Sequence, residues 1–161
     1  VFKNIKEVDQ YDSIINLQGD MPIISPLDIR KVNEPLIQGF DIGTLVTNIK
    51  KNELLDNNIT KAKIDWITHE KLGIALDFYK GSKEIFKNIY HHVGIYSFRF
   101  NILKRFVKLQ PSQNEIYYKL EQWRALDAKM NIGTSFANDV PISVDTKEDL
   151  IKIENIIKSN K

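Results

Sequence analysis

Residues 13–20 read S-I-I-N-L-Q-G-D, an apolar run that ends in a glycine and an aspartate. A short run of branched apolar residues before a turn signal predicts a buried β-strand over Ser13 to Gln18. Similar runs follow and alternate with amphipathic stretches, a pattern typical of an α/β layered sheet. The other predicted strands are 43–48, 62–67, 73–79 and 91–99; the segment 79–87 is ambiguous. The predicted helices are 26–32, 101–109, a long one from Ser112 to the stop at 131–133, and one after Thr146.

Two of these helices begin with capping signals. Ser112 and Glu115 have the spacing of a capping box, in which each side chain satisfies a backbone N–H of the first turn. Thr146 caps the last helix in the same way, with Asp149 at the third position. Each helix has an apolar stripe for burial. The stripes are Ile116, Leu120, Trp123 and Leu126 in the first, and Leu150, Ile153 and Ile157 in the second.

The composition excludes several classes of protein. The chain has 161 residues, 23 basic and 21 acidic side chains, and no cysteine. This charge balance argues against a nucleic-acid binder, and the lack of cysteine excludes disulfides, thiol catalysis and thiolate metal sites. No apolar run approaches the roughly 20 residues of a membrane span. Glycine-rich phosphate loops and paired-histidine zinc motifs do not occur. We expect one cytoplasmic domain over residues 1–161 that binds neither nucleic acid nor membrane.

Two aspartates follow predicted apolar strands. Asp20 ends the first strand, and Asp145 follows the short run Ile142–Val144. In open α/β sheets, ligands bind beyond the carboxyl ends of the strands, so the two carboxylates could hold Mg²⁺ there. The alternative is structural: Gly19-Asp20 is also an ordinary turn, and Asp145 lies at a helix N-terminus, where the helix dipole favours an aspartate.

The strand around Gly94 has two different faces. Alternation puts His92, Gly94, Tyr96 and Phe98 on one face, and Val93 and Ile95 on the face that suits the core. Gly94 leaves room for a ligand between an imidazole and a phenol. Alternatively, Gly94 marks a bulge or a close backbone contact, and His92 is a structural histidine. The roles of Glu121 and Gln122 are also undecided, because charged helix residues mostly face water and Glu121 can pair with Arg124.

In order along the chain, four motifs resemble the CMP-Kdo synthetases, or 3-deoxy-manno-octulosonate cytidylyltransferases. Residues 14–22, I-I-N-L-Q-G-D-M-P, are similar to that family's strand ending in Q-G-D-E-P. Residues 92–96, H-V-G-I-Y, are similar to its H-x-G-I-Y strand. Residues 111–124 resemble its P-S-P-L-E and L-E-Q-L-R helix, and residues 144–150, V-D-T-K-E-D-L, its V-D-T-P-E-D-L ending. The match spans nearly the whole chain.

The resemblance implies a Rossmann-like nucleotidyltransferase fold, a mixed sheet flanked by helices, in a homodimer. It implies an enzyme that joins CTP and Kdo into CMP-Kdo and pyrophosphate for lipopolysaccharide synthesis in the cytoplasm, with Mg²⁺ as cofactor. By motif match, Asp20 and Asp145 would be the catalytic metal ligands. The substrate-binding residues would be Gln18, Lys80, His92, Tyr96, Glu121 and Gln122.

The sequence also departs from this family. The basic loop that cradles the CTP phosphates is not recognisable, so we expect the first βα unit to be absent and the domain to be incomplete at its N-terminus. Met21 and Tyr118 replace family glutamates, and Lys80 replaces an arginine, keeping a charge for the Kdo carboxylate but not the forked geometry. We therefore expect little or no product from the chain alone. The alternative function is a non-catalytic remnant or binding module of the same family.

Overall fold

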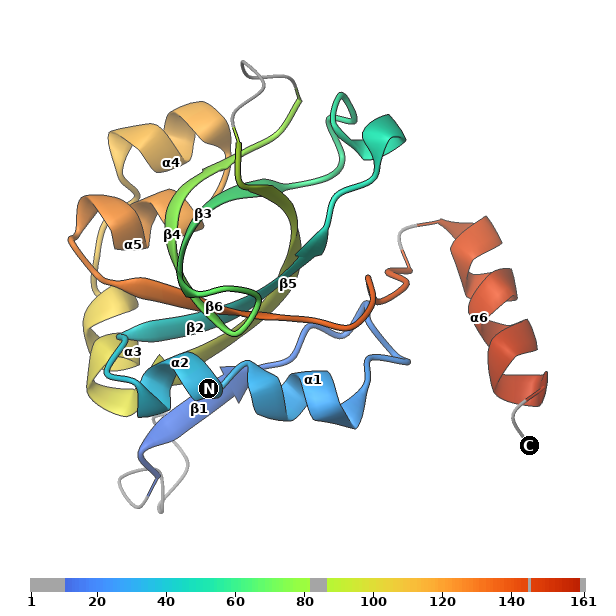
Figure 1. The fold of residues 1–161 in the computed structure, drawn as a ribbon, viewed down its shortest axis with the longest axis horizontal. Helices are drawn as coiled ribbons and strands as arrows, with labels where there is room; N and C mark the ends of the chain where they lie inside the picture. Colours follow the sequence, from blue (N-terminus) through green and yellow to red (C-terminus); the bar gives the residue numbers. More distant parts are fainter. Residues whose placement is uncertain (1–10, 82–86, 145, 160–161) are drawn as a thin grey trace.

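Six strands form one mixed sheet at the centre of the molecule (Figure 1). The computed structural model describes residues 11–81, 87–144 and 146–159. The strands are β1 (Ser13–Asn16), β2 (Ile42–Asn48), β3 (Lys61–Thr68), β4 (Leu72–Tyr79), β5 (Ile89–Arg99) and β6 (Ile132–Phe136). The helices are α1 (Pro26–Lys31), α2 (Glu34–Ile37), α3 (Phe100–Phe106), α4 (Gln113–Tyr118), α5 (Gln122–Asp127) and α6 (Lys147–Ser159), with a 3₁₀ turn at Lys51–Glu53.

The strand order is β1-β5-β2-β6-β4-β3, and β3 also pairs with β5. Five strands therefore close into the ring that is visible in Figure 1, with β1 outside it as an edge strand. β2 and β6 are parallel, whereas the other pairs are antiparallel. The predicted α/β class is thus confirmed, as are the strands at β2, β3, β4 and β5 and the helices at α1 and α3.

The sheet separates two apolar cores. One contains Phe78, Phe98 and Ile132 and lies under the helices α3, α4 and α5, with Tyr96 packed against it. The other contains Val93 and Ile95 and lies under the segment that includes α1. The predicted division of β5 into two faces is therefore correct.

Two local predictions about strands were wrong, and one strand was not predicted. The strand at 13–16 is not buried: it is the sheet edge, and the side chain of Ile15 is 38% exposed. Residues 142–144 form no strand, although the backbone N–H of Val144 donates to the carbonyl of Asp20 at 2.8 Å. β6 gives no clear signal in the sequence, because a five-residue strand that soon follows a helix shows no measurable periodicity and Gly133 is typical of a helix stop.

The predicted long helix from Ser112 is in fact two short helices. The capping box of Ser112 and Glu115 is present, but Lys119 ends α4 in the left-handed conformation (φ 55°, ψ 43°). This break turns the chain so that Leu120 is buried while Ile116 remains 66% exposed. The apolar stripe predicted from helical periodicity therefore packs against the core only after the break, from Leu120 onward.

α6 begins as predicted, because Thr146 and Asp149 exchange capping hydrogen bonds. Of its predicted buried stripe, Ile153 is buried, whereas Leu150 and Ile157 are 47% and 42% exposed. The helix stands to one side of the sheet at the C-terminal end of the chain (Figure 1). Its apolar periodicity therefore overestimates the contact that it makes with the described part of the domain.

Candidate functional site

A cavity of about 520 Å³ opens between the edge of the sheet and the helices α3 and α5. Its polar wall comes from the end of β1, from β5 and from the break between α4 and α5. Its apolar wall comes from the core side chains of three strands and from α3. The lining residues are Ile14, Ile15, Asn16, Gln18, Ile42, Tyr96, Phe98, Leu103, Phe106, Val107, Lys119, Leu120, Glu121, Gln122, Ala125 and Ile132.

Four predicted substrate-binding residues line this one cavity: Gln18, Tyr96, Glu121 and Gln122. The Gln122 amide donates a hydrogen bond to the Tyr96 hydroxyl. Burial raises the pKa of that hydroxyl, so Tyr96 stays protonated. Within the described chain, Oε1 of Gln122 is buried without a hydrogen-bond partner. A buried acceptor left unpaired costs free energy, so a ligand donor that reached this oxygen would offset that cost.

An ion-pair network fixes α5 against α4. Arg124 binds both oxygens of Glu115, and the Arg124 Nε to Glu115 Oε2 distance is 2.7 Å. Hydrogen bonding to Arg124, set against desolvation, keeps the pKa of Glu115 below its usual value. The exposed carboxylate of Glu121 lies 3.6 Å from the same guanidinium. Glu121 thus has the predicted helix-surface pairing and also lies at the rim of the cavity.

His92 lies behind Tyr96 rather than on the cavity wall. Its imidazole packs edge-on against Phe78, with ring centroids 5.0 Å apart, and its Nε2 lies 2.9 Å from the Thr44 hydroxyl. That hydroxyl donates to the Ile95 carbonyl, so a neutral imidazole donates to it through Nε2. Burial lowers the pKa of His92 to about 3. This is the environment of a structural histidine, one of the two interpretations of the strand.

The structure predicts an acid sensitivity that comes from His92. Its folded pKa lies below the ordinary 6.5, so the unfolded chain binds the proton more readily and stability falls as the pH drops below 6.5. We expect a loss of about 2 kcal/mol between pH 7 and pH 5. Urea unfolding at both pH values measures it. His92→Gln should flatten this loss and His69→Gln, on the exposed β3–β4 turn, should not; an equal loss in His92→Gln would contradict the assignment.

The loop after β1 meets the segment before α6. Asp20 is exposed, and its Oδ2 accepts a hydrogen bond from the Ser143 hydroxyl at 3.2 Å. Asp145 lies outside the described residues, so its predicted distance to Asp20 stays a prediction. Within the described ranges, no group of three or more acidic or histidine side chains is placed to hold a metal. Asp20 offers an accessible carboxylate, the ligand type that Mg²⁺ prefers.

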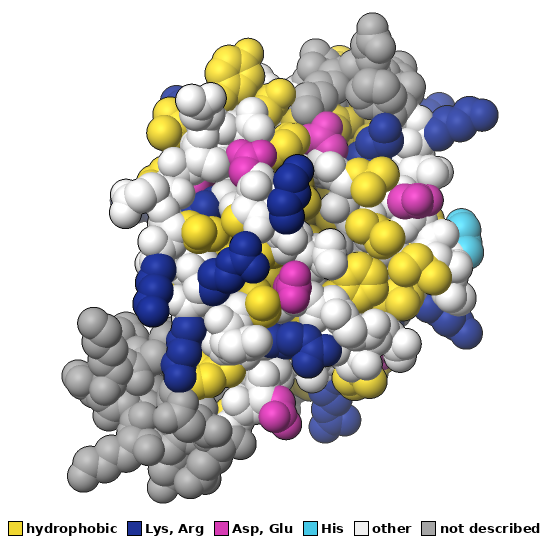
Figure 2. Space-filling model, turned by 90° about the vertical axis from the view of Figure 1, so that its left-hand side faces the viewer, with side chains coloured by type: hydrophobic (Ala, Val, Ile, Leu, Met, Phe, Trp, Pro, Cys, Tyr) yellow, Lys and Arg dark blue, Asp and Glu magenta, His cyan; other side chains and the backbone are white. Residues whose placement is uncertain are grey.

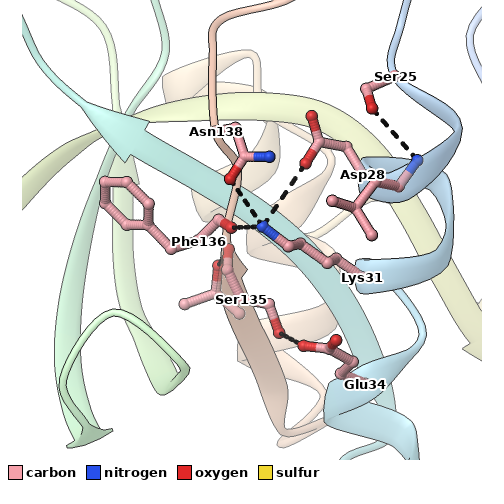
Figure 3. A network of polar contacts seen from close by, with 9 residues as sticks. Ser25, Asp28, Lys31, Glu34, Ser135, Phe136 and Asn138 are labelled. Atoms are coloured by element: carbon pink, nitrogen blue, oxygen red, sulfur yellow. Dashed lines mark hydrogen bonds and ion pairs between the residues drawn. The ribbon is translucent and has the colours of Figure 1, made fainter.

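A second polar network anchors the start of the segment that joins β6 to α6 (Figure 3). The Lys31 ammonium donates to the carbonyl of Phe136 at 3.2 Å and to the side chain of Asn138 at 3.0 Å. It also lies 4.0 Å from the buried carboxylate of Asp28. The chain leaving β6 is therefore held by α1 at one end and by the Asp20 loop at Ser143 and Val144.

Lys80 does not line the cavity, although the sequence analysis assigned it to the substrate carboxylate. Two parts of the cavity wall were not predicted from the sequence: Lys119, and the apolar floor that includes Leu103 and Phe106. The apolar spacing of 101–109 indicated a helix with a buried face but not that this face bounds a cavity. Lys119 gave no signal, since it sits inside a segment that was predicted to be continuous helix.

The sheet, its flanking helices and the cavity at the sheet edge define an α/β protein with a nucleotidyltransferase fold. A solved UDP-glucose pyrophosphorylase complexed with UDP-glucose covers 93% of this chain at a TM-score of 0.66 and 10% identity, which shows the fold alone. The chain itself belongs to the cytidylyltransferase family, because the family model of that description matches residues 1–132. The resemblance found in the sequence is thus confirmed.

Two further comparisons show which cytidylyltransferases this chain is similar to. A 3-deoxy-manno-octulosonate cytidylyltransferase from Paramagnetospirillum magneticum is 36% identical over 165 residues, covering 99% of this chain. A solved CMP:2-keto-3-deoxy-manno-octonic acid synthetase complexed with CTP covers 93% of this chain at 28% identity and a TM-score of 0.82. The chain spans 67% of the first protein and 63% of the second. Among the described residues, no helix has the length and apolar character for crossing a membrane.

Proposed function

We propose that this protein transfers a cytidylyl group from CTP to Kdo, giving CMP-Kdo and pyrophosphate. The observation that carries the proposal is the cavity that gathers Gln18, Tyr96, Glu121 and Gln122 in a chain of the cytidylyltransferase family. The relatives named as Kdo cytidylyltransferases, and a similar structure solved with CTP, support the substrate pair. We further propose a Mg²⁺-dependent homodimer that serves lipopolysaccharide synthesis in the cytoplasm.

The cavity supplies hydrogen-bonding groups that suit a polyhydroxylated sugar. Because Gln122 donates to the oxygen of Tyr96, the phenolic proton is left for an acceptor on the substrate. The unpaired Oε1 of Gln122 can accept from a substrate hydroxyl. With the substrate bound, the apolar floor would shield these hydrogen bonds from water and strengthen them. Tyr96 and Gln122 would thus orient the sugar so that its anomeric hydroxyl faces the α-phosphorus of CTP.

Asp20 lies on the loop that leaves β1, the strand that forms one wall of the cavity. Ser143 orients its carboxylate, and the N–H of Val144 fixes the backbone of the same residue. An accessible carboxylate is a suitable ligand for Mg²⁺, and we propose that Asp20 and Asp145 together hold this ion. When bound, this ion would neutralise the charge on the transferring phosphate. Asp20 and Ser143 would then position the nucleotide relative to the sugar.

The test is pyrophosphate release from CTP, Kdo and Mg²⁺. The chain spans about two-thirds of its relatives, so we expect weak turnover from the chain alone. Turnover should rise when the part of the Paramagnetospirillum relative that lies outside the match is added. Omission of Kdo should abolish release, since water is not the intended nucleophile. Kdo binding without turnover in the supplemented mixture would instead indicate the non-catalytic binding module, and no Kdo binding would contradict both functions.

A further inference from the structure

One basic residue, to which neither the sequence motifs nor the family resemblance assigned a role, lines the cavity. Lys119 lines it, between buried Leu120 and the end of α4. Apart from Glu121, the other lining residues are uncharged. A sugar acid brings a carboxylate into this space, and a carboxylate near an apolar floor needs a cationic partner or several hydrogen-bond donors.

The charges around the rim leave Lys119 available. Glu121, the acidic residue beside it, is paired with Arg124 at 3.6 Å. Within the described chain, no acidic side chain pairs with the Lys119 ammonium. Arg124 is itself held by both oxygens of Glu115 and does not line the cavity. Among the lining residues, Lys119 is therefore the positive charge that is available to an anionic substrate group.

The backbone at Lys119 has an uncommon conformation. Its φ of 55° is left-handed, which L-residues other than asparagine and aspartate adopt rarely. The break both ends α4 and directs Gln122 toward Tyr96, so Lys119, Gln122 and Tyr96 line the same cavity. Figure 2 shows the side of the molecule that carries α3, α4 and α5, where dark-blue Lys and Arg side chains lie among hydrophobic ones.

We propose that Lys119 determines specificity by binding the substrate carboxylate, in the place that the sequence analysis gave to Lys80. The inference rests on the proposed function, because it takes the ligand to be a sugar acid. Carboxylate recognition can nevertheless be tested apart from catalysis: the site should distinguish a carboxylate from a neutral group of similar shape. Lys119 is a binding residue on this view, and the hydroxyl contacts belong to Tyr96 and Gln122.

Calorimetric binding of Kdo and of its uncharged methyl ester tests the proposal. The wild-type protein should prefer the acid. Lys119→Met should lower the affinity for Kdo about tenfold, the worth of a charge-assisted hydrogen bond, and leave the ester unaffected. Lys119→Arg should restore the preference. The matched control is Lys129→Met, a second exposed lysine with a left-handed backbone (φ 57°) at the end of α5, which should bind like wild type.

The outcomes separate the two proposals. If Lys119→Met keeps the preference for the acid, or if Lys80→Met removes it, the assignment of Lys119 is overturned while the proposed function stands. If the wild type binds acid and ester equally, the carboxylate is not recognised, and the inference fails alone. If it binds neither compound, the proposed function fails and the inference fails with it. Circular dichroism of each variant checks that the fold is retained.

Discussion

Asp20→Asn is expected to reduce the rate of CMP-Kdo formation by about a hundredfold to a thousandfold, the effect of removing one fixed electrostatic group from a transfer site. Asparagine is nearly isosteric and can still accept the hydrogen bond of Ser143, so the loop should keep its conformation. What is lost is the negative charge of the carboxylate, which we propose binds Mg²⁺. Pyrophosphate release in the supplemented assay measures the rate, and Mg²⁺ titration should show a higher requirement.

The control for this prediction is Asp65→Asn. Asp65 is an exposed aspartate on β3 and does not line the cavity. Its replacement should leave the rate within twofold, since charges far from the site are screened by salt. Ser143→Ala should fall between the two variants, because it removes only the orientation of the carboxylate. A wild-type rate and a wild-type Mg²⁺ requirement in Asp20→Asn would rule out its proposed role.

Gly43→Ala is expected to destabilise the fold by about 3 kcal/mol, the upper range for overpacking a well-filled core. A methyl group on Gly43 would overlap the carbonyl oxygen of Val32 and lie 2.5 Å from the Ser97 hydroxyl. These two groups are themselves joined by a buried hydrogen bond of 2.6 Å, so neither can move without loss. The midpoint of urea unfolding measures the change.

Gly94→Ala is the matched control, on the adjacent strand β5. A methyl group there meets no atom within 4 Å. Alanine restricts the unfolded chain more than glycine does, so this variant should be neutral or slightly more stable. Equal destabilisation by the two substitutions would show that a general cost of alanine in the sheet, rather than the close approach of α1 and α2 to β2, explains the Gly43 result.

Much of the candidate site could be predicted because its residues lie in motifs that resemble those of a known family. The Q-G-D stretch, the H-x-G-I-Y strand and the L-E-Q segment each carry residues that meet in the cavity, namely Gln18, Tyr96, Glu121 and Gln122. The depth of each side chain could not be predicted in the same way. His92 and Tyr96 share a strand face, yet Phe78 and Thr44 enclose the first while the second reaches the cavity.

The sequence by itself determined the α/β class, four strands, the helix caps and the family. Periodicity, capping and motif spacing are local patterns, and they can be recognised without knowing which residues are neighbours in space. Only the tertiary structure decided the rest. β6 exists because β2 offers it a parallel partner, with Gly133 opposite Gly43 under α2. The helix from Ser112 breaks at Lys119 because burying Leu120 and bonding Trp123 to the Phe78 carbonyl outweigh helical continuity. Both outcomes depend on contacts between residues distant in sequence, and no local pattern encodes them.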